Sequence, residues 1–234
     1  MQRSTKKKRM TSHNTKNTLK KRTKQYLLKP KLSKNTDAKT LIGSAKTIIA
    51  KPLIELTNFR WSDKKDLLEL TSKQHIMKFI GLGKTWSSTD VDKYIKYTFQ
   101  DSKIPTLKRQ WFSYAIRYNG KLAGVVEFKT MNISTYIPEN IREQFKNDVI
   151  MTIFINDKYQ GKGLGKTIVE LLKVQVRKYK PNAKKIIALV KENNLVMQQI
   201  IPKLGFTKLT NLTIIRKDGT ESHPIIYTTE IWAN

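Results

Sequence analysis

The sequence predicts an α/β (α+β) domain with a mixed, mostly antiparallel sheet of about seven strands flanked by about four helices, preceded by a disordered basic arm. Three observations support this fold class. Two apolar segments meet at an Asn119-Gly120 turn, which is typical of an antiparallel hairpin. A buried strand, a glycine-rich loop and a long helix lead into another apolar strand, and this order requires a parallel pair. The first 40 residues are basic and poor in large apolar side chains.

Composition limits the classes of function. The chain has 234 residues with 46 Lys and Arg against 18 acidic residues, a net charge of +28 that attracts polyanions such as nucleic acid. It has no cysteine, which excludes disulfides, cysteine zinc sites and cysteine nucleophiles, and its three scattered histidines give no reason to expect a metal. No segment is apolar over the length of a membrane span. We expect an intracellular protein without membrane contact, cytoplasmic, nuclear or in a DNA-containing compartment such as a viral factory or virion.

Residues 1–40 form the predicted arm. They hold 14 Lys and Arg and one acidic residue, so they carry 14 − 1 = +13, and residues 41–234 carry 28 − 13 = +15. A segment so polar cannot bury enough apolar surface to offset its ordering entropy. The basic clusters Lys6–Arg9 and Lys20–Arg22 favour a nuclear-localisation or nucleic-acid-binding arm, although a merely solvated tail fits the same composition.

The globular domain is predicted to span residues 41–234, and its first half begins with a strand over 52–59. A helix follows from Ser62, placed as the N-cap, with Asp63 in the first turn. A second helix starts near Thr89. The hairpin comes next, with strands over 111–118 and 121–130.

The second half begins with an insertion, 131–147, that contains a short helix starting at Pro138. Its apolar residues argue for packing rather than disorder; they are Tyr136, Ile137, Ile141 and Phe145. An apolar strand over 148–155, buried on both faces, precedes the glycine loop. The elements expected after that loop are a helix over 164–179 ended by Pro181, a strand over 184–190, a helix over 193–206, and two strands around an Asp218-Gly219 turn.

The loop sequence YQGKGLGKT, residues 159–167, ends like a nucleotide-binding P-loop. That motif requires a glycine where this chain has Gln160, and the even spacing of Gly161, Gly163 and Gly165 does not fit the dinucleotide motif either. A plain turn would need only one glycine. Unpaired amide groups at the start of a helix, reinforced by the helix dipole and nearby lysines, instead indicate an anion site.

Two motifs together resemble the GNAT superfamily of N-acetyltransferases. Residues 160–165 match the coenzyme A signature Q/R-x-x-G-x-G/A, between a buried strand and a long helix. Residues 192–206, ENNLVMQQIIPKLGF, are similar to a helix that the family carries downstream. With the order of strands, the resemblance covers residues 52–232.

The resemblance implies acetyl-CoA as cofactor, with its pyrophosphate on the loop amides and its pantetheine arm on the preceding strand, where that strand splays from the next. It implies direct transfer of acetyl to an amine, on a protein lysine, an N-terminus or a small molecule, and leaves the acceptor and the oligomeric state open. The residues assigned to the cofactor are Ile153, Phe154, Ile155, Gln160, Gly161, Lys162, Gly163, Leu164, Gly165, Lys166 and Asn194.

The chain departs from the family at the proton-transfer groups. Ile201 stands where many members have a tyrosine as general acid, and Pro202 should kink that helix. The candidates for the general base are Asp148, Glu127 and Glu192, each of which could equally be a solvated carboxylate. We hypothesise that one strand–insertion–strand unit lines the acceptor side of the cleft and attracts a cationic amine. Its acidic residues are Glu127, Glu139, Glu143 and Asp148. The alternative is a catalytically weak or inactive GNAT-fold protein that associates with nucleic acid.

Overall fold

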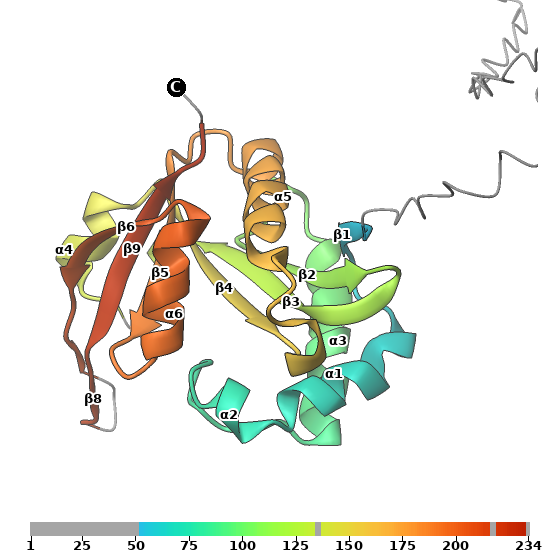
Figure 1. The fold of residues 1–234 in the computed structure, drawn as a ribbon. Coiled ribbons are helices and arrows are strands. Elements are labelled where there is room, and N and C mark those ends of the chain that lie inside the picture. The colour runs from blue at the N-terminus through green and yellow to red at the C-terminus, as the bar shows by residue number, and fades with distance from the viewer. Residues whose placement is uncertain (1–51, 134–136, 216–218, 233–234) are drawn as a thin grey trace, which may run out of the picture. The chain divides into compact units, whose positions relative to one another are not determined.

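The computed structural model describes residues 52–133, 137–215 and 219–232. The predicted arm, with its clusters Lys6–Arg9 and Lys20–Arg22, lies outside these residues. Seven strands form one sheet in the order β1-β2-β3-β4-β5-β9-β6 (Figure 1). The sheet strands are β1 (Ile54–Thr57), β2 (Trp111–Tyr118), β3 (Lys121–Thr130), β4 (Val149–Ile155), β5 (Lys185–Lys191), β6 (Thr207–Asn211) and β9 (Pro224–Glu230).

The pairing of these strands confirms the mixed sheet. β1 to β4 pair antiparallel in sequence order, β4 and β5 pair parallel, and β9 lies antiparallel between β5 and β6. Asn119 and Gly120 both have positive φ, as the predicted hairpin turn requires. Two further short strands, β7 (Ile214–Ile215) and β8 (Glu221–Ser222), pair beyond the β6–β9 ladder. Gly219 lies between them, while Asp218 is outside the described residues.

Helices cover both faces of the sheet. The apolar sides of α1 (Lys64–Thr71) and α3 (Ser88–Ser102) pack on one face of β2, β3 and β4. The opposite face packs against α5 (Leu164–Tyr179), whose predicted stripe is buried at Leu164, Ile168, Leu172 and Val176. The remaining helices are α2 (Gln74–Met77), α4 (Glu139–Gln144) and α6 (Leu195–Ile200). Within the described ranges, no helix is long and apolar enough to cross a membrane.

The start of α1 corrects one prediction. Ser62 is not the N-cap, because it lies inside a 3-10 turn, η1 (Trp61–Asp63), and α1 begins at Lys64. Asp63 is buried, and its two carboxylate oxygens accept hydrogen bonds from the Arg117 guanidinium at 2.6 and 2.7 Å. The acidic residue expected in an exposed first turn thus belongs to a buried ion pair.

The insertion between β3 and β4 packs onto the domain, as expected. It begins with a 3-10 turn, η2 (Met131–Ile133), and includes α4, which follows Pro138. Ile137 and Phe145 are buried in a cluster that Ile141 flanks, while Tyr136 lies outside the described residues.

Candidate active site

β4 and β5 separate after three paired positions. The parallel ladder joins only Val149–Met151 to Ile186–Ala188, whereas β5 pairs with β9 along its whole length. The second half of β4 keeps its β3 partners but, among the residues that the structure describes, has no ladder partner on the other side. Figure 1 shows the two strands diverging from this point. The splay predicted near Ile153–Ile155 is therefore present.

The open edge of β4 presents backbone groups toward β5. The Asn156 amide donates to the Ala123 carbonyl of β3. Backbone groups alternate in direction along a strand, so those of Ile153 and Ile155 point away from β3. The side chain of Phe154 packs against the α1 and α3 layer, and those of Ile153 and Ile155 flank the α5 layer. The strand thus leaves main-chain donors and acceptors, rather than side chains, for a ligand in the gap.

The glycine loop follows β4 through a 3-10 turn, η3 (Asp157–Tyr159). Gly161 and Gly163 have φ of 71° and 72°, in the left-handed region that favours glycine. Gly163 is the N-cap of α5, and its position has no side-chain cap. The first amides of a 16-residue helix are therefore available to an anion, and they carry the positive end of its dipole.

Other loop residues pack against the domain. A Cβ at Gly165 would lie 3.0 Å from Leu204 Cδ2, so glycine permits the contact between α5 and the 3-10 turn η4 (Ile201–Leu204). Lys162 Nζ lies over the rings of Tyr118 and Tyr159. The structure brings all of the sequence-predicted loop residues together at one end of β4.

In the segment after β5, the structure shows what Asn194 and Pro202 do. Asn194 caps α6, with its side-chain oxygen accepting from the Met197 amide at 3.1 Å. The helix ends at Ile200 and continues as η4, with Pro202 in its first turn, which confirms the predicted break. Ile201 is fully buried in the core, so this position presents no proton donor.

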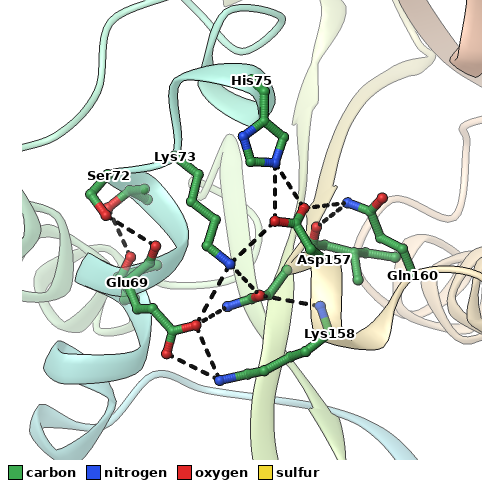
Figure 2. A network of polar contacts seen from close by, with 11 residues as sticks. Glu69, Ser72, Lys73, His75, Asp157, Lys158 and Gln160 are labelled. Atoms are coloured by element: carbon green, nitrogen blue, oxygen red, sulfur yellow. Dashed lines mark hydrogen bonds and ion pairs between the residues drawn. The ribbon is translucent and has the colours of Figure 1, made fainter.

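A polar network ties the loop to α1 and α2 (Figure 2). Lys73 Nζ donates to Asn156 Oδ1 at 2.9 Å and pairs with Asp157 at 3.3 Å, and His75 Nε2 lies 3.0 Å from the same carboxylate. Burial opposes ionisation of Asp157, but the hydrogen bonds from His75 and Lys73 outweigh it and lower the pKa of that carboxyl. Gln160 Nε2 donates to the Ile155 carbonyl at 2.7 Å.

Glu69 completes the network. Its carboxylate accepts from Asn156 Nδ2 at 3.1 Å and from Lys158 Nζ, and these two hydrogen bonds lower its pKa. On the other side of the gap, Lys191 Nζ at the end of β5 donates to the Lys78 carbonyl just after α2, at 2.7 Å. The α2 segment is therefore bonded to the ends of both diverging strands.

Glu127 is the predicted base with the most enclosed carboxyl group. It lies on β3 opposite Thr152, the first β4 residue beyond the β5 ladder. Tyr94 Oη and Ser113 Oγ both donate to its Oε1, at 2.6 and 3.0 Å. Burial raises the pKa of Glu127, although the two hydroxyls oppose that shift. A carboxyl with a raised pKa beside the open edge is suited to proton transfer.

The other acidic candidates lie elsewhere. Asp148 precedes β4, at the end opposite the glycine loop, and its Oδ1 accepts the amides of Lys184 and Lys185 at 2.9 Å each. This placement favours a structural role. Glu139 and Glu143 are exposed on α4, and Glu192 is exposed just after β5. The structure therefore does not gather Glu127, Glu139, Glu143 and Asp148 around one cleft.

Sequence reasoning missed several residues around Glu127. Tyr94 lies in the helix predicted to start near Thr89, and its hydroxyl contact joins residues 33 positions apart. Trp86 packs at a tilt against Tyr94 at a ring distance of 4.9 Å and meets Phe154 edge-on at 6.4 Å. The alternation of β2 and β3 could have indicated that Ser113 and Glu127 lie on the same face, but it could not identify Tyr94 as the partner.

Comparisons with known proteins agree with this geometry. The family model for an acetyltransferase (GNAT) domain matches residues 54–207. No curated protein sequence matches the chain. An aminoglycoside acetyltransferase, AAC(6')-Ib, solved with ribostamycin and coenzyme A, is 20% identical at a TM-score of 0.57, over 76% of this chain and 93% of the other.

Two other solved structures are similar at comparable levels. Spermidine N-acetyltransferase from Vibrio cholerae, with coenzyme A and spermine, is 16% identical at a TM-score of 0.55, over 74% of this chain and 94% of that one. RimL, a ribosomal alpha-N-protein acetyltransferase solved with coenzyme A, is 14% identical at a TM-score of 0.59, over 77% of this chain and 96% of that one. At these identities the structural likeness establishes the fold alone.

Proposed function

Because the chain belongs to the GNAT family of acetyltransferases, we propose that it transfers acetyl from acetyl-CoA directly to a primary amine. The observation that supports this most is the gap between β4 and β5, which opens beside the glycine loop and ends near Glu127. Structural relatives bind coenzyme A or acetyl-CoA.

The residues around the gap fit this cofactor. The amides of the loop from Gly161 to Lys166 would hold the pyrophosphate, with the side chains of Lys162 and Lys166 adding positive charge. The main chain of Ile153, together with the Ile155 amide, would hydrogen-bond the pantetheine amides as a further strand would. The bound cofactor supplies a thioester that an amine can attack, and no acyl-enzyme is needed.

Glu127 would take the proton of the attacking amine. An ordinary alkyl amine has a pKa of about 10.4, so it needs a group that removes a proton near neutral pH. The Tyr94 and Ser113 hydroxyls both donate to Oε1, which leaves Oε2 for that proton. Because Glu127 faces the α3 side of the sheet, we expect a water molecule to carry the proton to it.

The leaving group requires less help. In the transfer the amine nitrogen forms a bond to the acetyl carbon, and the carbon–sulfur bond breaks to release the coenzyme A thiolate. A free thiol has a pKa of about 8.5, so its thiolate is a stable leaving group that takes a proton from water. A buried Ile201 in place of a tyrosine is compatible with this reaction.

The variant Glu127→Gln tests the assignment. We expect kcat/KM to fall by about 10²- to 10⁴-fold. The rate of the parent should rise with pH as Glu127 loses its proton. This rise should come at a pH above 4.5, the ordinary pKa of a glutamate, because burial raises the pKa of Glu127. That rising limb should be absent from the variant. Acetyl-CoA affinity, measured by calorimetry, should stay within about twofold.

Glu143→Gln is the matched control, because Glu143 is exposed on α4 and its ion pair with Lys146 is solvated. It should keep both the rate and the pH profile. A Glu127→Gln protein with the parent rate and pH limb would show that another group is the base. Acetyl-CoA binding without acetylation of any amine would instead favour the nucleic-acid-associated alternative.

A further inference from the structure

A pocket of about 380 Å³ lies between the loop that follows α2 and the first turns of α3. Its walls include the rings of Trp86 and Tyr94, the Leu82 side chain and the Asp90 carboxylate. The segment 80–86 is held in place by the Trp86 amide, which donates to the Thr71 carbonyl at 3.0 Å. The sequence analysis assigned no role to this region.

Two of the lining residues connect the pocket with the residues proposed to react. The ring of Tyr94 lines it, and the hydroxyl of the same side chain donates to Glu127 Oε1 at 2.6 Å. Trp86 packs at a tilt against Tyr94 and also meets Phe154 on the open half of β4. A ligand in the pocket would therefore lie against a ring whose hydroxyl contacts Glu127.

The wall chemistry favours a cation on an apolar chain. Indole and phenol faces attract ammonium groups and pack against methylene groups. Asp90 adds a carboxylate at the pocket wall, and its hydrogen bonds from the Ser87 hydroxyl and amide both use Oδ2. Those bonds lower the pKa of Asp90, so it stays ionised at neutral pH.

Tyr94 lies between two carboxylates. Asp90 and Tyr94 are four residues apart on α3, about one helical turn of 5.4 Å. The Tyr94 hydroxyl donates to Glu127, whose carboxyl group is enclosed behind the pocket wall. In a chain of net charge +28, an exposed carboxylate on the pocket wall and a second one behind that wall are an unusual local environment.

We propose that this pocket binds the acceptor as a linear alkyl diamine, with one ammonium group at Asp90, the methylene chain along Trp86 and Tyr94, and the reacting amine directed toward Glu127. This assignment rests on the proposed function, which it narrows to a substrate class.

The test compares hexane-1,6-diamine with hexylamine, which has the same chain but no second ammonium. With acetyl-CoA, the parent should have a KM at least about tenfold lower for the diamine. Asp90→Asn should raise the diamine KM by about tenfold and leave that of hexylamine within about twofold. Trp86→Ala should weaken both amines, because both chains lie along the indole.

Ser87→Ala is the matched control, because it disturbs the same cap of α3 by removing the hydrogen bonds of the Ser87 hydroxyl, while keeping the Asp90 charge. It should leave the ratio of the two KM values unchanged. Equal shifts in Ser87→Ala and Asp90→Asn would overturn the proposal, and so would equal KM values for the two amines in the parent. Efficient acetylation of a lysine peptide or kanamycin, with none of the diamine, would also overturn it.

Calorimetry with hexane-1,6-diamine alone separates the two levels of the hypothesis. Binding that Asp90→Asn weakens, without any acetylation, would support the pocket and contradict the proposed acetyltransferase activity. Acetylation of amines without discrimination at Asp90 would support the activity and contradict the pocket assignment.

Discussion

At the scale of single residues, partners far apart in the sequence decide what each charged group does. Asp63 could be read as a helix-start residue, yet its carboxylate is buried against the Arg117 guanidinium, 54 positions away. Arg117 also donates to Thr57 Oγ1 at 2.9 Å, which ties β1, β2 and the start of α1 together. Local propensity could not predict this role, because the same acidic residue also suits a solvated first turn.

The buried pair gives a stability prediction. Asp63→Asn should lower the free energy of unfolding by about 3–5 kcal/mol, because it leaves the Arg117 charge buried without its partner. Asp92→Asn is the control, since the Asp92–Lys64 pair is exposed and should contribute at most about 1 kcal/mol. Urea unfolding of the two variants measures both values. Equal losses would show that Arg117 finds another acceptor.

At the scale of secondary structure, the sequence predicts the elements well where periodicity and turn chemistry agree. The Asn119-Gly120 hairpin, the α5 stripe and the break at Pro202 all follow from local rules. The glycine loop could be located for the same reason. The network of Lys73, His75 and Asp157 could not, because it joins α2 to a turn more than 80 positions later.

The glycine loop gives a prediction for binding. Gly163→Val should raise the Kd for acetyl-CoA more than about tenfold, because a side chain would stand where the phosphate approaches the amides. Gly120→Val is matched to it: both glycines have positive φ, and neither Cβ would meet an atom within 4 Å. Both variants should lose similar stability from backbone strain, about 1–3 kcal/mol. Equal acetyl-CoA affinity in the two variants would contradict the loop assignment.

At the scale of the whole molecule, charge is divided unevenly along the chain. Residues 1–40 carry +13 of the net +28. The basic clusters in this arm stay a proposal for nucleic-acid binding, separate from the acetyl transfer that we assign to the domain. Composition alone predicts this division, whereas the position of the pocket that we propose for the acceptor depends on tertiary contacts that composition does not encode.

Deletion of residues 1–40 tests whether the arm, rather than the domain, binds nucleic acid. Affinity of the full chain for duplex DNA should fall steeply with salt, since each phosphate contact releases counterions. The deletion should flatten that dependence on salt. It should leave the melting temperature within about 2 °C, because the loss of an arm that does not pack on the domain changes the free energy of unfolding little. A large fall in melting temperature would show that the arm packs on the domain, and an unchanged salt slope would place DNA binding on the domain itself.

The attachment of α2 to the ends of both β4 and β5 has a thermodynamic consequence. These strand ends share no ladder pairs. Lys73 and His75 contact the residues just after β4, and the Lys78 carbonyl accepts a hydrogen bond from Lys191 at the end of β5. Their separation is therefore fixed before any ligand arrives, and a ligand entering between them has little backbone left to order. Association would then lose little chain entropy, as is general for preorganised receptors. The short helix α2, which also buries Ile76 and Met77 in the core, would in this way set the entropy of cofactor binding.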